Sequence, residues 1–253
     1  MTDLSGKVAL ITGGGQGVGQ GIALALAAVG ARVAVTGRTA DKLETTCGLV
    51  AERKGQALAI EGNVKDPQQL AAMVEKVASW GDGIDILVNN AQEVPVGKLL
   101  DVGDDAFIAG FESGPLASLR LMKLVYPHMA KREGSVIFNL VSSAGVRWDM
   151  TGYGAYGAVK QAMRVLTRAA AAEWGRDGIR VLAIAPHAES PGLKRWIKHN
   201  PEEAEAFFRT IPLGRVGRLE EDVGRAVVAL CGSGLGYLTG ATIPLDGGQA
   251  HFG

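Results

Sequence analysis

Cysteine is scarce in this chain of 253 residues, which contains only Cys47 and Cys231. Neither has the neighbours or the spacing of a disulfide framework or a zinc site, so we expect reduced, packed thiols of the kind found in cytoplasmic proteins. Histidine is also rare, with four residues scattered along the sequence. The sequence therefore gives no metal-binding signature.

Net charge and long apolar runs are missing as well. Lysine and arginine together number 26 and aspartate and glutamate number 26, which gives a formal net charge of zero. A nucleic-acid or anionic-membrane partner requires a basic face, so neither is expected. No apolar run is long enough to span a bilayer, and no leading basic and apolar segment is evident. We therefore expect a cytoplasmic protein with no membrane partner.

Short apolar segments alternate with amphipathic ones along the sequence, without a linker, a repeat or a low-complexity tract. The pattern predicts strands at Val8–Thr12, Arg32–Thr36, Ala57–Glu61, Ile84–Asn89, Ser135–Val141, Arg180–Ile184 and Ala241–Leu245. It predicts helices between them, including Pro67–Trp80, about Asp105 to His128, Ala155–Trp174 and Glu220–Leu230. This alternation indicates an α/β fold in one domain over residues 1–253. We expect a Rossmann-type, doubly wound, mainly parallel seven-stranded sheet with helices on both faces.

The first predicted strand runs directly into a glycine-rich loop, GGGQGVGQG, and then into an apolar helix. This order presents backbone N–H groups and the positive end of a helix to a phosphate. Gly13 permits the tight turn, Gly17 lets a pyrophosphate approach the backbone, and Gly19 lets the helix pack against the strand. A merely flexible loop is the alternative. We favour a dinucleotide site that uses Gly13, Gly15, Gln16, Gly17, Val18 and Gly19.

The second predicted strand leads into Gly37 and Arg38. Proteins that prefer NAD usually place an acidic side chain near this point, where it accepts hydrogen bonds from the ribose hydroxyls. Gly37 leaves room there, and the guanidinium of Arg38 suits a phosphate monoester. We therefore expect NADP(H) to be preferred, with NAD(H) as the alternative.

Tyr156 and Lys160 lie four residues apart on the predicted helix Ala155–Trp174, so their side chains share one face. A cation beside a phenol favours the phenolate, so we expect Lys160 to lower the pKa of Tyr156 and to allow proton exchange at physiological pH. Ser143 lies thirteen residues before Tyr156, just after the apolar run VIFNLV, and would hydrogen-bond the oxygen of a substrate carbonyl or alcohol. An alanine-rich helix can also contain this tyrosine and lysine by chance.

Together, TGGGQGVG, NNA, Ser143, YGAVK and the closing YLTGATIPLDGG resemble the short-chain dehydrogenase/reductase family over roughly residues 4–248. The resemblance implies that Tyr156 donates or accepts the proton and that Ser143 orients the substrate. It implies that Lys160 lowers the tyrosine pKa and holds the nicotinamide ribose. It also implies assembly as a homotetramer or homodimer. The further cofactor residues implied by the family pattern are Asn63, Val64, Asn90 and Pro186, besides Tyr156 and Lys160.

Three positions depart from the family pattern. Gln92 stands where the NNAG motif has glycine, and His187 stands where a glycine follows the proline of the sixth strand. The family's catalytic asparagine would fall at about Gly114 or Pro115, and no asparagine follows Gln92 before the fifth strand. In the family that asparagine holds a water that links the lysine to solvent. The resemblance therefore implies an altered proton relay in this chain.

Pro115 lies within the helix predicted from about Asp105 to His128. Proline has no N–H and clashes with the carbonyl four residues earlier, so we expect a bent helix and a free carbonyl at Phe111. That carbonyl, with Ser113, would hold the relay water. The alternative is that Gly114 and Pro115 begin the helix later, with proline in its first turn.

Ligands of open α/β sheets bind outside the carboxyl ends of the strands. We expect a substrate lid there at about residues 187–212. The candidate substrate contacts are Gln92, Trp148, Met150 and Trp196, which would suit an apolar or aromatic carbonyl compound. Helix packing is the alternative explanation for Trp196.

The sequence predicts an oxidoreductase that transfers hydride between NADP(H) and a small-molecule carbonyl or secondary alcohol, with Tyr156 as general acid/base. The alternative is a cofactor-binding protein with little activity, which would act as a sensor or scaffold. The altered residues Gln92, Gly114 and His187 motivate that alternative.

Overall fold

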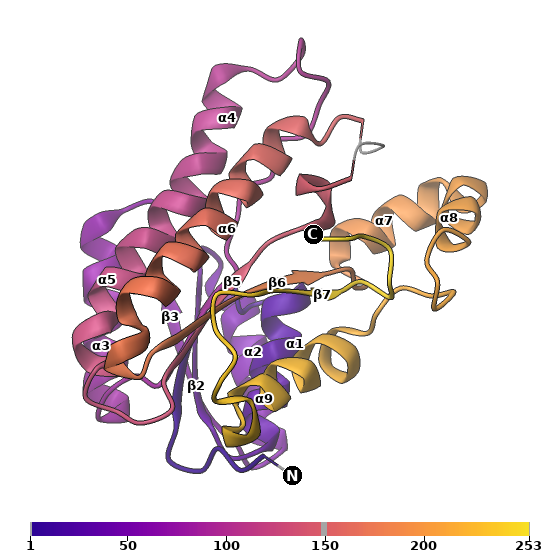
Figure 1. Ribbon diagram of the computed structural model, residues 1–253. Coiled ribbons are helices and arrows are strands. Elements are labelled where there is room, and N and C mark those ends of the chain that lie inside the picture. Colours follow the sequence, from indigo (N-terminus) through magenta and orange to yellow (C-terminus); the bar gives the residue numbers. More distant parts are fainter. Residues whose placement is uncertain (1, 148–150, 253) are drawn as a thin grey trace.

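The computed structural model describes residues 2–147 and 151–252. Within these residues, seven strands form one sheet in the order β3-β2-β1-β4-β5-β6-β7, and all neighbouring strands are parallel (Figure 1). The strands are β1 (Val8–Thr12), β2 (Arg32–Gly37), β3 (Gln56–Glu61), β4 (Ile86–Asn89), β5 (Val136–Leu140), β6 (Arg180–Pro186) and β7 (Thr242–Leu245). The predicted parallel, Rossmann-type sheet is confirmed.

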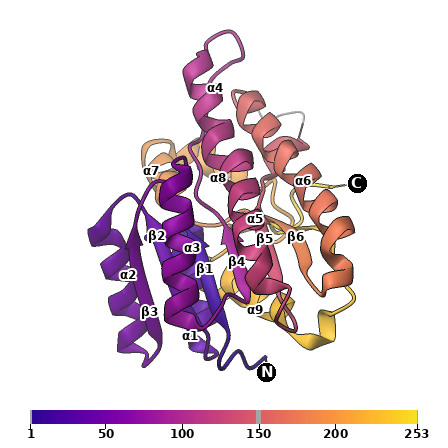
Figure 2. The ribbon, with the colours of Figure 1, turned by 90° about the vertical axis from the view of Figure 1, so that its left-hand side faces the viewer.

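Helices cover both faces of the sheet. They are α1 (Gly17–Ala28), α2 (Ala40–Glu52), α3 (Pro67–Gly81), α4 (Asp104–Phe111), α5 (Ala117–Met129), α6 (Gly154–Trp174), α7 (Pro191–His199), α8 (Pro201–Phe208) and α9 (Arg225–Cys231). Helices α1, α2 and α9 pack on one face, and α3, α5 and α6 pack on the other (Figures 1 and 2). No helix within residues 2–147 and 151–252 has the length and apolar character needed to cross a membrane.

The core forms because the central strands are apolar on both of their faces. Every residue of β1, β4 and β5 is buried. Side chains alternate between the faces, so Phe138 packs under α1 and α9, whereas the adjacent Ile137 packs under α3 and α5. This burial on both faces explains why the strands appear in the sequence as continuous apolar runs.

Asp85 joins the start of β1 to the start of β4. Its buried carboxylate accepts hydrogen bonds from the backbone N–H of Val8 at 2.9 Å, Arg132 Nε at 2.8 Å and Lys7 Nζ at 3.0 Å. Burial alone would raise the pKa of this carboxyl, but the hydrogen bonds outweigh it and the pKa is lowered. Asp85 therefore remains charged and fixes the relative position of these two strands.

Pro115 lies inside a continuous helical segment. A π-helical stretch, Glu112–Leu116, joins α4 to α5, and the N–H of Ala117 donates to the carbonyl of Glu112 five residues earlier. A proline that supplies no N–H is accommodated in this way without ending the helix. The alternative in which the helix begins at Gly114 and Pro115 is therefore wrong.

Candidate active site

A groove of about 250 Å³ lies at the carboxyl ends of β1 to β4, where the order of the strands reverses. Such a reversal parts the loops that follow neighbouring strands and leaves a crevice between them. The groove is lined by Gly13, Gly15, Gln16, Gly37, Arg38, Thr39, Lys42, Leu43, Gly62, Asn63, Val64, Ala91, Gln92, Glu93 and Ser113. Of the predicted cofactor residues, it brings together Gly13, Gly15, Gln16, Arg38, Asn63 and Val64.

The glycine loop is held in a form that only glycine permits. Gly13 and Gly17 have φ angles of +66° and +60°, which other residues rarely adopt. A Cβ on Gly19 would lie 2.5 Å from the carbonyl oxygen of Gly13, so α1 packs directly on the loop. Asn90 Nδ2 donates to the carbonyls of Thr12 at 2.9 Å and Gly13 at 3.1 Å, which ties the loop to the end of β4.

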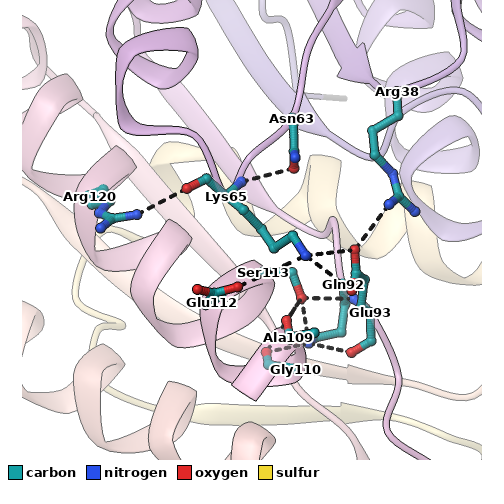
Figure 3. Close-up of polar contacts among 10 residues, drawn as sticks. All are labelled: Arg38, Asn63, Lys65, Gln92, Glu93, Ala109, Gly110, Glu112, Ser113 and Arg120. Carbon is teal, nitrogen blue, oxygen red and sulfur yellow. Dashed lines mark hydrogen bonds and ion pairs between the residues drawn. The ribbon is translucent and has the colours of Figure 1, made fainter. Parts of the chain in front are cut away.

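Basic side chains line the groove where β2 ends. Arg38 and Lys42 both reach it, and a Cβ on Gly37 would meet only Leu43, at 3.6 Å. Arg38 Nη1 lies 3.0 Å from a carboxylate oxygen of Glu93, which comes from the loop after β4. Figure 3 shows this pair across the groove. The space beside Gly37 and the two cations fit the adenosine ribose end of a nicotinamide dinucleotide.

Asn63 and Val64 form the wall after β3. The side-chain oxygen of Asn63 accepts a hydrogen bond from the N–H of Lys65 at 3.1 Å, and Val64 is 8% exposed. Lys65 Nζ lies 3.5 Å from Oε1 of Glu93, the same oxygen that Arg38 approaches (Figure 3). Glu93 therefore bridges the two sides of the groove.

Lys160 is buried beside Tyr156 on α6. Its Nζ lies 5.4 Å from the centre of the Tyr156 ring and donates to the carbonyl of Leu140 at 2.7 Å. Only 3% of Lys160 is exposed, and burial lowers its pKa to about 7. The ammonium and the neutral amine are therefore present in similar amounts at neutral pH.

Tyr156 holds its proton firmly. Burial raises the pKa of the phenol to about 12, while a hydrogen bond with Ser142 lowers it and the nearby Tyr153 raises it. The pKa of Tyr156 is therefore raised and not lowered as predicted, because the effect of burial is the largest. Burial also lowers the pKa of Lys160, which weakens the cation that was expected to stabilise a phenolate.

The serine that hydrogen-bonds Tyr156 is Ser142. Ser142 is extended, with φ −151° and ψ 149°, and its hydroxyl also accepts the N–H of Ala144 at 3.2 Å. The predicted Ser143 follows it and begins a short 3₁₀ turn, Ser143–Gly145. The role of Ser143 toward a substrate stays a prediction, and Ser142 is a second candidate for that role.

The amide nitrogen of Gln92 is bound within the protein, and its predicted contact with a substrate stays a prediction. Its Nε2 donates to the carbonyls of Glu93 at 2.7 Å and Gly110 at 2.8 Å, so the amide is turned toward α4 (Figure 3). Trp148 and Met150 lie outside the described residues. The geometry at Gln92 therefore assigns its amide to the protein's own backbone.

The segment predicted as a lid contains α7 and α8. Trp196 packs edge-on against Phe207 with ring centres 5.9 Å apart, which agrees with the alternative of helix packing. The segment approaches the glycine loop, because a Cβ on Gly17 would lie 3.3 Å from Cδ of Pro191. Its first turn therefore lies at the phosphate end of the expected cofactor site.

Pro186 and His187 mark the start of this segment. Pro186 is the last residue of β6 and pairs with Leu245 of β7. The ring of His187 packs against Phe207 at 5.2 Å, and burial lowers the pKa of its imidazole. Nδ1 of His187 is buried without a hydrogen-bond partner among the described residues. These contacts are those of a packed loop residue.

A family model described as enoyl-(acyl carrier protein) reductase matches residues 13–250, nearly the whole chain. A 12α-hydroxysteroid dehydrogenase of a Clostridium species is 37% identical over 97% of each protein. The chain belongs to the short-chain dehydrogenase/reductase family. Two solved members of the family have closely similar folds. One is a 7α-hydroxysteroid dehydrogenase complexed with NADH and 7-oxo glycochenodeoxycholic acid, with a TM-score of 0.91 and 31% identity over 98% of this chain and 96% of that one. The other is Pseudomonas aeruginosa RhlG in a complex with NADP, with a TM-score of 0.91 and 29% identity over 98% of each chain.

Lys42 is a groove residue of this short-chain dehydrogenase/reductase that the sequence analysis did not name. It lies in the first turn of α2, just after β2, so it could have been found by its place after a strand. Ser113 was named only for the relay water and not for the groove, because it lies on a helix far along the chain. Among the described residues, no group of three or more histidine, cysteine, aspartate or glutamate side chains could hold a metal ion.

Proposed function

We propose that this chain is an NADP(H)-dependent oxidoreductase that interconverts a ketone and a secondary alcohol, with Tyr156 as general acid/base. The observation that carries the proposal is the meeting of Ser142, which follows β5, with Tyr156 and Lys160 of α6, beside β4, the strand whose following loop lines the groove. Membership of the oxidoreductase family supports the reaction class.

The proton is handled by Tyr156 in this proposal. With a pKa of about 12 the phenol is protonated at neutral pH, which is the form that the reduction of a carbonyl consumes. The hydroxyl of Ser142 hydrogen-bonds the carbonyl oxygen and directs it at the phenol. Lys160 replaces the lost proton, since its pKa of about 7 allows both uptake and release at neutral pH. The bound nicotinamide supplies the hydride.

The preference for NADP(H) rests on Gly37, Arg38 and Lys42. These residues place room and two cations where the adenosine ribose of a dinucleotide lies in this fold, and no acidic residue from β2 or its following loop lines the groove. Glu93 opposes this preference because it already neutralises Arg38. One solved relative binds NADH and another binds NADP, so we test the preference directly by titration.

The substrate in this proposal is an apolar ketone or secondary alcohol covered by residues 187–212. The position of Pro191 beside Gly17 supports a lid that closes over the cofactor and the substrate together. The hydroxysteroid dehydrogenases among the relatives suggest that steroid ketones belong in the first substrate panel, beside smaller aliphatic and aromatic ketones.

The deciding experiment combines cofactor binding and turnover. Purified protein is titrated with NADPH and NADH by fluorescence and then assayed against the ketone panel with the preferred cofactor. We expect tighter binding of NADPH and turnover that falls at least about 1,000-fold in Tyr156→Phe, with NADPH binding retained. Cofactor binding without turnover of any ketone or alcohol would favour the alternative of a sensor or scaffold.

We also propose that the chain assembles as a homotetramer, or failing that a homodimer. Apolar side chains of α4, the π-helical stretch and α5 are partly exposed on one face, namely Phe107 at 39%, Ile108 at 52%, Leu116 at 38% and Leu119 at 36%. A contiguous apolar face of this kind is typical of a subunit contact. The mass in solution, measured by light scattering, tests the assembly.

A further inference from the structure

Gln92 and Gly114, two of the residues that depart from the family pattern, lie in contact in the structure. Gly114 lies buried in the π-helical stretch, and a Cβ added there would overlap Oε1 of Gln92 and lie 3.0 Å from Cγ1 of Val159 on α6. The side chain of Gln92 thus occupies the space that any side chain on residue 114 would enter. Val159 directly precedes Lys160, so this space adjoins the catalytic face of α6.

The amide group of Gln92 links α4 to the loop after β4 by hydrogen bonds. Its Nε2 donates to the carbonyl of Gly110 at 2.8 Å and to the carbonyl of Glu93 at 2.7 Å, and it lies 3.3 Å from Ser113 Oγ. Ser113 Oγ in turn accepts the N–H of Glu93 at 2.9 Å and donates to the carbonyl of Ala109 at 2.7 Å. Figure 3 shows these contacts converging on one point. The π-helical stretch and the edge of the groove therefore form one hydrogen-bonded unit.

The carbonyl end of the same amide has no such partner. Oε1 of Gln92 is buried and accepts no hydrogen bond from any described residue. A buried acceptor without a donor costs about 1–3 kcal/mol, which offsets part of what the two hydrogen bonds of Nε2 contribute. An acceptor left open at such a cost, beside the groove and α6, points to a functional role.

We propose that Gln92 is the positioning residue of this active site. The helix has no asparagine at residue 114. The carboxamide of Gln92, which lies in the loop after β4, takes over the role of that missing side chain. It holds the π-helical stretch against the groove and presents an acceptor beside the segment that carries Lys160. The inference rests on the proposed function, because it assigns Gln92 to the proton path of Tyr156 and Lys160. Gln92 acts through these residues and does not touch the substrate.

The first test replaces Gln92 with methionine, which has a similar length but no carboxamide. We expect kcat to fall about tenfold or more while KM for the ketone changes less than about threefold, and the pH dependence of kcat to shift because proton return to Lys160 is slowed. A kcat and a pH profile unchanged within twofold in Gln92→Met would overturn the proposal.

The second test moves the carboxamide back to the helix. Because the ring of Pro115 disfavours a Cβ on the preceding residue, the series is made in a Pro115→Ala background. It compares Gln92→Gly, Gly114→Asn and the two together. Each single change should lower kcat, the first by removing the amide and the second by overlap, and the combination should recover kcat to within about threefold of the background. A combination no better than the poorer single change contradicts the proposal.

Urea unfolding without cofactor supplies a readout that does not depend on turnover. The combined variant should unfold at a higher urea concentration than either single change, because Gln92 and Gly114 are in contact. If the unmodified protein reduces no ketone, the proposed function fails, while this coupling still tests the contact. If the protein is active but the three variants behave additively in unfolding and in kcat, the inference alone fails.

Discussion

The free energy of unfolding of Lys160→Met, minus that of wild type, should be larger at neutral pH than at alkaline pH. The folded protein binds the Lys160 proton with a pKa of about 7, against an ordinary value of 10.5. Between these two pH values the unfolded chain holds more protons than the folded one, so the stability of wild type rises with pH. Methionine does not titrate, so its contribution to the free energy of unfolding does not vary with pH.

The size of the expected change in stability follows from the shift in the pKa of Lys160. One pKa unit corresponds to about 1.4 kcal/mol, so burying the charged lysine costs on the order of 5 kcal/mol at and below pH 7. By pH 9 about 2 kcal/mol of that cost has been relieved. Methionine also leaves the carbonyl of Leu140 without its donor, at a cost of about 1–3 kcal/mol that does not vary with pH. The difference between the two pH values is therefore the quantity that tests the reasoning.

The assay is urea unfolding of wild type and Lys160→Met at pH 7 and pH 9, without cofactor. The free energy of unfolding of the variant minus that of wild type should fall by about 2 kcal/mol between these pH values. Lys123→Met is the control, since Lys123 is exposed on α5 and its replacement should give a constant difference. A constant difference for Lys160→Met would show that Lys160 has an ordinary pKa and would refute the argument.

Two further predictions concern carboxylates. Glu93→Gln should tighten NADPH binding about fivefold, because Arg38 is released from an ion pair worth about 1 kcal/mol, and should leave NADH binding unchanged. Titration of the variant with NADPH and NADH measures both affinities, and Glu112→Gln serves as the control outside the groove. An equal increase in affinity for both cofactors would contradict the prediction. Asp85→Asn should lower the free energy of unfolding by about 3 kcal/mol at pH 7, because Arg132 then lies beside a neutral partner at a buried site. Urea unfolding measures the loss, and a loss below about 1 kcal/mol would count against a charged Asp85.

The sheet was predictable because its residues carry a strong local signal. The apolar run that forms β1 was placed at its observed bounds, and the other strands were placed within two residues at each end. The helix from about Asp105 to His128 was found as one element, but the π-helical stretch around Pro115 was not. Propensity identifies a proline that interrupts the hydrogen-bond pattern, whereas the choice between a break and a π-helical stretch depends on what packs beside it.

The site was harder to predict where it depends on contacts between distant segments. Tyr156 and Lys160 were found because one helix carries both, but the hydrogen bond between Ser142 and Tyr156 depends on the path of a loop. Gln92 and Gly114 each appear in the sequence as a separate departure from the family pattern. Their contact with each other cannot be seen from the sequence alone. The pKa of Lys160 depends on burial by the surrounding chain, which no local pattern records.

The order of the strands has a consequence for how the protein is made. Strand β1 lies inside the sheet and is synthesised first, and its two neighbours β2 and β4 both precede residue 90. Residues 1–93 contain every residue that lines the groove except Ser113, whereas Tyr156 and Lys160 follow much later. Long-range parallel pairing is slow, and nascent chains tend to fold from the N-terminal side. A chain still on the ribosome therefore carries most of the groove before it carries Tyr156 or Lys160.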